Sequence, residues 1–102
     1  MPFRSAYDGG RSMSWRIFRY EIPVDDQWHT IALLGDPLAV GCRRLNVVEF
    51  WARWATDGSA GVDRRFMVIG TGHMAPNNAW RHWGTAIAPG GQLVWHLIED
   101  TS

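Results

Sequence analysis

The chain of 102 residues contains no lysine; all ten basic residues are arginine, and ten acidic residues balance them. Arginine codons are richer in G and C than lysine codons, so a GC-rich genome explains this bias without a biochemical cause. A general electrostatic attraction to DNA or RNA requires a surplus of basic residues. The formal net charge of zero therefore argues against a nucleic-acid partner.

Cysteine and long apolar runs are also scarce. The single Cys42 cannot form an internal disulfide, and one cysteine excludes a cysteine-rich zinc site. No stretch approaches the roughly 20 apolar residues of a membrane-spanning helix. The N-terminal residues lack the apolar centre of a signal peptide. We therefore expect a cytosolic protein, in a reducing compartment and without a membrane partner.

Motifs of known enzymes are absent as well. There is no nucleophile elbow, Walker loop, paired-cysteine metal motif or dinucleotide-binding fingerprint. The four histidines do not have the spacing of a known zinc site, and the combination of His73 and His82 with Glu99 is the only zinc trio we consider. We expect no catalytic residues, no metal and no cofactor, and hence a protein that is not an enzyme.

What the sequence does contain is a regular succession of strand-like segments separated by turn signals such as Pro89-Gly90-Gly91. They recur about every ten residues, without a helical pattern. This predicts an all-β fold, a small single-domain antiparallel sandwich or barrel with little or no helix. The seven predicted strands are 14–22, 28–34, 38–42, 47–55, 64–69, 80–87 and 92–99.

Some details of this fold are also predictable. We expect residues 13–102 to form the β domain and residues 1–12 to be a disordered or loosely attached leader. The strand at 47–55 should pair antiparallel with the strand at 64–69 across a hairpin loop. Gly41 indicates a bulge or a close backbone contact within its strand. The seven tryptophans should dominate the core or a subunit interface.

The segment from Arg64 to Thr85 has the densest polar chemistry of the chain. It contains the sequence Gly70-Thr71-Gly72-His73, in which two glycines allow a ligand to approach the backbone closely. Successive backbone N–H groups of such a loop form an anion-binding nest, to which histidine and arginine add donors. The alternative is a structural bend in which Thr71 bonds to the backbone. Our candidate ligand-binding residues are Arg64, Arg65, Thr71, Gly72, His73, Arg81, His82 and Trp83.

Other polar residues have simpler interpretations. Asp25, Asp26 and His29 lie at the entrance of a strand, where turn chemistry explains both aspartates and no activated nucleophile stands beside them. His96 alternates with Val94 and Ile98, which predicts a hydrogen-bonded, half-buried side chain rather than a ligand to a metal.

Five short segments together form a combined pattern. They are Tyr20–Asp26, Trp28–Ile31, the GTGH sequence at 70–73, Gly84-Thr85 and Val94-Trp95-His96. This pattern resembles an uncharacterised family of small bacteriophage proteins, common in phages of actinobacteria, that carry a domain of unknown function. The resemblance covers about residues 14–99, and its GTGH and VWH segments are the most specific. It implies a phage origin and a location in the host cytoplasm, but no activity.

Size, loop chemistry and this origin lead to one main expectation. The protein should be a homo-oligomer that sequesters an anionic small molecule, such as a nucleotide-derived immune signal of the host, at the GTGH loop. Two alternatives remain open at this point. One is a protein-binding module that inhibits a host enzyme through exposed tryptophan and arginine side chains, and the other is a minor structural protein of the virion.

Overall fold

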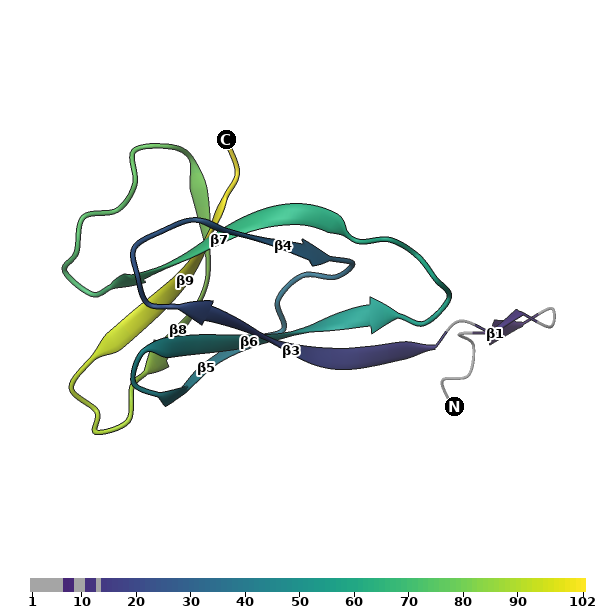
Figure 1. Cartoon of the computed structure of the whole chain (residues 1–102), viewed down its shortest axis with the longest axis horizontal. Coiled ribbons are helices and arrows are strands. Elements are labelled where there is room, and N and C mark those ends of the chain that lie inside the picture. Colours follow the sequence, from purple (N-terminus) through teal and green to yellow (C-terminus); the bar gives the residue numbers. More distant parts are fainter. Residues whose placement is uncertain (1–6, 9–10, 13) are drawn as a thin grey trace.

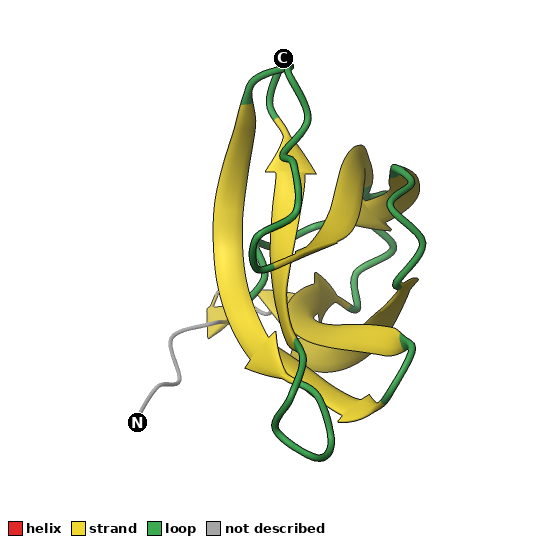
Figure 2. Ribbon diagram, turned by 90° about the vertical axis from the view of Figure 1, so that its left-hand side faces the viewer, coloured by secondary structure: helices red, strands yellow, loops and turns green. Residues whose placement is uncertain are grey.

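The computed structural model describes residues 7–8, 11–12 and 14–102, and this part of the chain consists of strands and loops without a helix (Figure 2). None of the described residues belongs to a helix long and apolar enough to cross a membrane. The strands, in chain order, are β1 (Tyr7–Asp8), β2 (Arg11–Ser12), β3 (Trp15–Pro23), β4 (His29–Leu33), β5 (Ala39–Arg44), β6 (Val47–Ala55), β7 (Val62–Gly70), β8 (Trp80–Ile87) and β9 (Val94–Asp100).

The long strands form two antiparallel sheets, which confirms the predicted all-β fold. One sheet has three strands in the order β3-β6-β5, and the other has four in the order β4-β7-β9-β8 (Figure 1). Within the predicted leader, β1 and β2 pair with each other over two residues each, and the other residues of 1–12 lie outside the described part. The disorder predicted for that leader therefore stays a prediction.

The hydrophobic core lies between the two sheets. Alternate residues of β6 and β7 point inward, so that Phe50 and Phe66 meet across the layers with their ring centroids 5.1 Å apart. Of the seven tryptophans only Trp95 is buried, at 9% exposure, and Trp15 is 43% exposed. Aliphatic and phenylalanine side chains, rather than tryptophans, therefore make up most of the core, and the alternative expectation that the tryptophans form a subunit interface stays a prediction.

The predicted pairing of β6 with β7 is wrong. β6 pairs with β3 and β5, whereas β7 pairs with β4 and β9, so the connection at 56–61 joins two sheets rather than closing a hairpin. Packed sheets lie about 10 Å apart, a distance that six residues of extended chain span easily. β6 and β7 each have an apolar face. Because the two strands lie in different sheets and these faces point toward each other, both faces are buried in the core.

Two glycines within strands mark irregular pairing, as predicted for Gly41. The register of β5 against β6 shifts between Gly41 and Arg44, and that of β8 against β9 shifts between His82 and Gly84. At Gly84 a Cβ atom would lie only 2.6 Å from Cγ2 of Val40 on β5. The absence of a side chain at this position therefore lets β5 and β8 pack closely where the two sheets meet.

Candidate functional site

The predicted anion-binding arginine Arg64 lies on the inner side of β7, where it forms a buried ion pair. Its Nε and Nη2 donate to Glu99 over 2.7 and 2.8 Å, and its Nη1 lies 3.0 Å from Oδ1 of Asp36. The hydrogen bonds from Arg64 hold the pKa of Glu99 below its ordinary value, although burial acts in the opposite direction. Arg64 thus stabilises the fold and does not line a pocket with the GTGH loop.

The other predicted donors on these strands also have protein partners. Arg65 forms an ion pair with Asp100 and lies over the ring of Trp28, 5.2 Å from its centroid. Arg81 lies 4.0 Å from the ring centroid of Trp83, whose indole N–H donates to Glu99 over 2.8 Å. Arg65, Arg81 and Trp83 are therefore separate from the loop that we predicted them to assist.

The GTGH sequence forms a tight turn at the end of β7. The backbone N–H of His73 donates to the carbonyl of Gly70 over 3.0 Å, and Gly72 has a φ of 88°, which glycine adopts without strain. A Cβ on Gly70 would lie 2.9 Å from the His73 ring and 3.0 Å from the Trp95 ring. Both glycines thus have a structural role, and the N–H groups of Thr71 and His73 are already bonded to carbonyls of Val94 and Gly70.

Next to this turn, two histidines and two threonines form a hydrogen-bonded group on the outer face of the four-stranded sheet. The Thr71 hydroxyl lies 2.8 Å from Nε2 of His96. On the other side of the same ring, Nδ1 of His96 lies 3.0 Å from the Thr85 hydroxyl and 3.2 Å from Nε2 of His82. The Thr85 hydroxyl is also 3.2 Å from Nε2 of His82, so three polar atoms form a nearly equilateral triangle.

The histidine hollow, a cavity of about 390 Å³, contains this group. Its floor is apolar, made of Ile69, Ile98 and Trp80, and its polar wall carries the two threonines, His82, His96 and His73. Of the described residues that line it, none is acidic. A site with an apolar floor and a few converging polar groups is typical of small-molecule binding.

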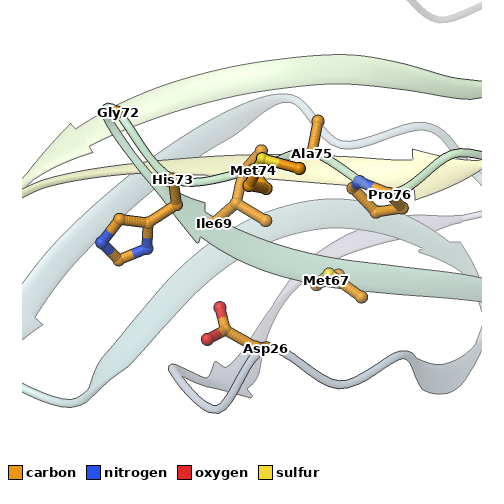
Figure 3. Close-up of a pocket in the computed structure, with 8 residues that line it drawn as sticks. All are labelled: Asp26, Met67, Ile69, Gly72, His73, Met74, Ala75 and Pro76. Atoms are coloured by element: carbon orange, nitrogen blue, oxygen red, sulfur yellow. The ribbon is translucent and has the colours of Figure 1, made fainter.

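A second cavity of about 590 Å³, the loop hollow, adjoins the first and shares Ile69, Gly72 and His73 with it. It lies between β7 and the connection that follows the GTGH turn, with Met67, Met74 and Pro76 among its lining residues (Figure 3). The connection is held near the sheet by Trp80, whose indole N–H donates to the carbonyl of Pro76 over 3.2 Å. We refer to these two adjoining hollows together as the groove.

Asp26 contributes a carboxylate to the loop hollow, where it points toward the strand that carries Ile69 (Figure 3). Asp26 is also the only non-glycine residue in the described part of the chain with a positive φ, of 58°. Asp25 differs from it, because its side chain accepts from the backbone N–H of Gln27 and from His29. Hydrogen bonds within the turn thus account for Asp25, as predicted, whereas the side chain of Asp26 faces the groove.

The structure therefore brings together four of the predicted site residues, Thr71, Gly72, His73 and His82, and adds Thr85, His96 and Asp26. His96 is half-buried and hydrogen-bonded, as predicted, but its partners make it the centre of the group. Thr85 was missed because strict alternation places positions 82 and 85 on opposite faces of a strand. The bulge at Gly84 adds one residue and brings both side chains to the same face.

The zinc trio that we considered does not form. Glu99 pairs with Arg64 on the inner side of the sheet, whereas His73 and His82 line the outer hollow. Within the described residues no group of three or more His, Cys, Asp or Glu side chains has a metal-binding arrangement. The hydroxyl–imidazole contact of Thr71 with His96 resembles a nucleophile beside a base, but none of the described carboxylates is hydrogen-bonded to His96 to complete such a system.

The fold and the groove define this chain as a small two-sheet β protein with an open polar–apolar groove on one outer face. Residues 13–102 match the family described as Domain of unknown function (DUF7352), and the chain belongs to that family. Comparisons with curated proteins and with solved structures give no match.

Proposed function

We propose that this protein binds a small molecule in the groove formed by the histidine hollow and the loop hollow. The observation that carries the proposal is the convergence of three imidazoles and two hydroxyls above an apolar floor. The cavities of about 390 and 590 Å³ fall within the range of roughly 300–1,000 Å³ that is usual for small-molecule sites.

An anionic group of the ligand fits the histidine hollow. No acidic side chain is among its described lining residues, and each imidazole becomes a cationic donor when it takes up a proton. The predicted arginines contribute little, because Arg64 and Arg65 are paired with Glu99 and Asp100. The imidazoles and threonine hydroxyls thus take the role that we first assigned to arginine.

The remainder of the ligand extends into the loop hollow. Met67, Ile69 and Pro76 offer an apolar surface for a ring or chain, and Asp26 accepts hydrogen bonds from amino or hydroxyl groups. A nucleotide-like molecule, with a phosphate at one end and a base or sugar at the other, has this distribution of groups. This agrees with the nucleotide-derived signal expected from the sequence.

The biological setting of the proposal derives from the family resemblance. We place the protein in the cytoplasm of a phage-infected host, where a homo-oligomer sequesters a signal of the host's defence. Sequestration requires binding without turnover.

The test is a ligand panel on the full chain in buffer containing EDTA, with phosphate, nucleoside monophosphates, cyclic nucleotides and ADP-ribose. A binder should raise the melting temperature, and calorimetry should give its affinity. The substitution His96→Gln should weaken binding of that ligand at least tenfold.

The control is Arg81→Gln, which removes a charge outside the groove and should leave the affinity for the ligand unchanged. No stabilisation by any member, or full binding by His96→Gln, would overturn the proposal.

A second candidate function is supported by the exposed apolar residues of β3. Trp15 and Ile17 are 43% and 62% exposed on this edge strand, and Arg53 lies over the Trp15 ring at 5.0 Å. Tryptophan and arginine are enriched at protein-interaction hot spots. A stoichiometric host protein recovered with the wild-type chain, but not with Trp15→Ala, would favour an inhibitory protein-binding module over small-molecule sequestration.

A further inference from the structure

Three polar atoms in the histidine hollow have mutual distances that match the ligand spacing around a metal ion. The distances between His82 Nε2, His96 Nδ1 and Thr85 Oγ1 are 3.2, 3.0 and 3.2 Å. Tetrahedral ligands with metal–nitrogen bonds of about 2.05 Å lie about 3.3 Å from one another. An ion placed just above this triangle would contact all three atoms at coordination distance.

We propose that His82 and His96 bind a divalent transition-metal ion, with the Thr85 hydroxyl as a third, weaker ligand. Imidazole nitrogens favour Zn²⁺, Cu²⁺, Ni²⁺ and Co²⁺, whereas Mg²⁺ and Ca²⁺ prefer sites made of oxygen atoms. Two imidazoles and a hydroxyl leave at least one coordination position for solvent or an anion. The site differs from a closed structural zinc centre, whose four ligands are all protein side chains.

The contact of Thr71 with His96 is compatible with this arrangement. A metal-binding histidine usually donates its second ring N–H to an oxygen, which fixes the tautomer and orients the ring. Thr71 Oγ1 lies 2.8 Å from Nε2 of His96. In the proposed metal-bound state His96 has the tautomer in which Nε2–H donates to Thr71, which leaves the lone pair of Nδ1 for the ion. Thr71 is therefore a positioning residue, attached to the hydrogen-bonded turn at the end of β7.

A metal-free network is the competing explanation for the same distances. In it, His82 Nε2–H donates to Thr85, the Thr85 hydroxyl donates to His96 Nδ1, and His96 Nε2–H donates to Thr71. Titration with a metal ion distinguishes the two states, because protons compete with the metal for both imidazoles only if the metal binds. The other ionisable groups facing this groove in the described part of the chain are His73 and, in the adjoining hollow, Asp26.

The site shares the histidine hollow with the proposed ligand but does not depend on that ligand. The experiment uses the full chain freed of metal by EDTA and dialysis, titrated with Co²⁺ and Zn²⁺ alone. Co²⁺ should produce d–d absorption of a nitrogen-ligated ion, and Zn²⁺ should displace it. The apparent affinity for the metal should decrease as the pH is lowered, because protons compete with the metal for the imidazoles.

Substitutions assign the site. His82→Gln and His96→Gln should each weaken Co²⁺ binding at least tenfold, and Thr71→Val should weaken it by about tenfold without abolishing it. His29→Gln, which removes an imidazole outside both hollows, is the matched control, and circular dichroism verifies that each variant is folded. Absence of Co²⁺ absorption in the folded wild type, or binding that survives both histidine substitutions, would overturn the proposal and leave the small-molecule test unaffected.

Discussion

Gly84 shows how a single missing side chain determines the packing of two sheets. Val40 of β5 occupies the space that a Cβ on Gly84 would need, at a distance of 2.6 Å. Gly84→Ala should therefore lower the free energy of unfolding by about 1–3 kcal/mol, as overpacking of a core usually does. Chemical denaturation measures this change.

A compensating substitution provides the control for Gly84→Ala. Val40→Ala removes the methyl groups that clash, so the double variant should be more stable than the sum of the two single effects predicts. Purely additive losses would show that Gly84 is required for a reason other than contact with Val40.

The buried pair of Arg64 with Glu99 leads to a second prediction at the residue scale. Glu99→Gln removes the negative charge opposite a half-buried arginine and should cost about 3 kcal/mol of stability. Glu21→Gln is the matched control, because Glu21 is 41% exposed and pairs with Arg44 at the surface over 2.6 Å. Exposed pairs contribute about 0–1 kcal/mol, so equal losses in the two variants would contradict this account.

At the scale of the element, β3 is an edge strand with exposed apolar side chains. Among the described strands it pairs only with β6, and Ile17 on it is 62% exposed. An unpaired edge strand is a ready template for addition of a second strand. Pairing of β3 with β3 of a second copy would join two three-stranded sheets and provides a structural basis for the homo-oligomer expected from the sequence.

This prediction is tested with Ile17→Lys, which places a charge on the β3 edge. Light scattering after size exclusion should show the wild type as a dimer or larger assembly and the variant as a monomer. Val62→Lys is the control, because Val62 has a similar exposure of 66% but lies on the interior strand β7. A monomeric wild type at all concentrations would exclude this assembly.

At the scale of the whole molecule, its buried carboxylates should make the fold sensitive to acid. Arg43 lowers the pKa of Glu49, and Arg64 lowers that of Glu99, through hydrogen bonds that outweigh burial. Because both groups bind protons more weakly in the folded state, they add stability above about pH 5 that is lost as the pH falls through their lowered pKa values.

Urea denaturation at pH 7, 5, 4 and 3 measures this dependence. The free energy of unfolding should decrease steadily below about pH 5, and a variant with both Glu49→Gln and Glu99→Gln should show a shallower decrease. A wild-type stability that is constant down to pH 3 would contradict the role of these ion pairs. The His82 and His96 side chains remain in both proteins, so they do not affect the comparison.

The sequence determined the strands themselves. Alternation of apolar and polar residues is a property of neighbouring positions, and turn residues such as Pro89-Gly90-Gly91 end a strand wherever it packs. The seven predicted strands accordingly correspond to β3–β9, and the all-β class follows from them. The site was predicted in part for the same reason, because Thr71, Gly72 and His73 are adjacent in one turn.

Only the tertiary structure decided which strands pair and which side chains converge. The residues at 56–61 fit either a hairpin or a crossover, and the burial of two apolar faces selects the crossover. Arg64 meets Glu99 rather than a ligand because β7 pairs with β9, which are distant in the sequence. The histidine group depends on the bulge at Gly84 and on the register of β8 with β9, which are properties of the assembled sheet and not of any one segment.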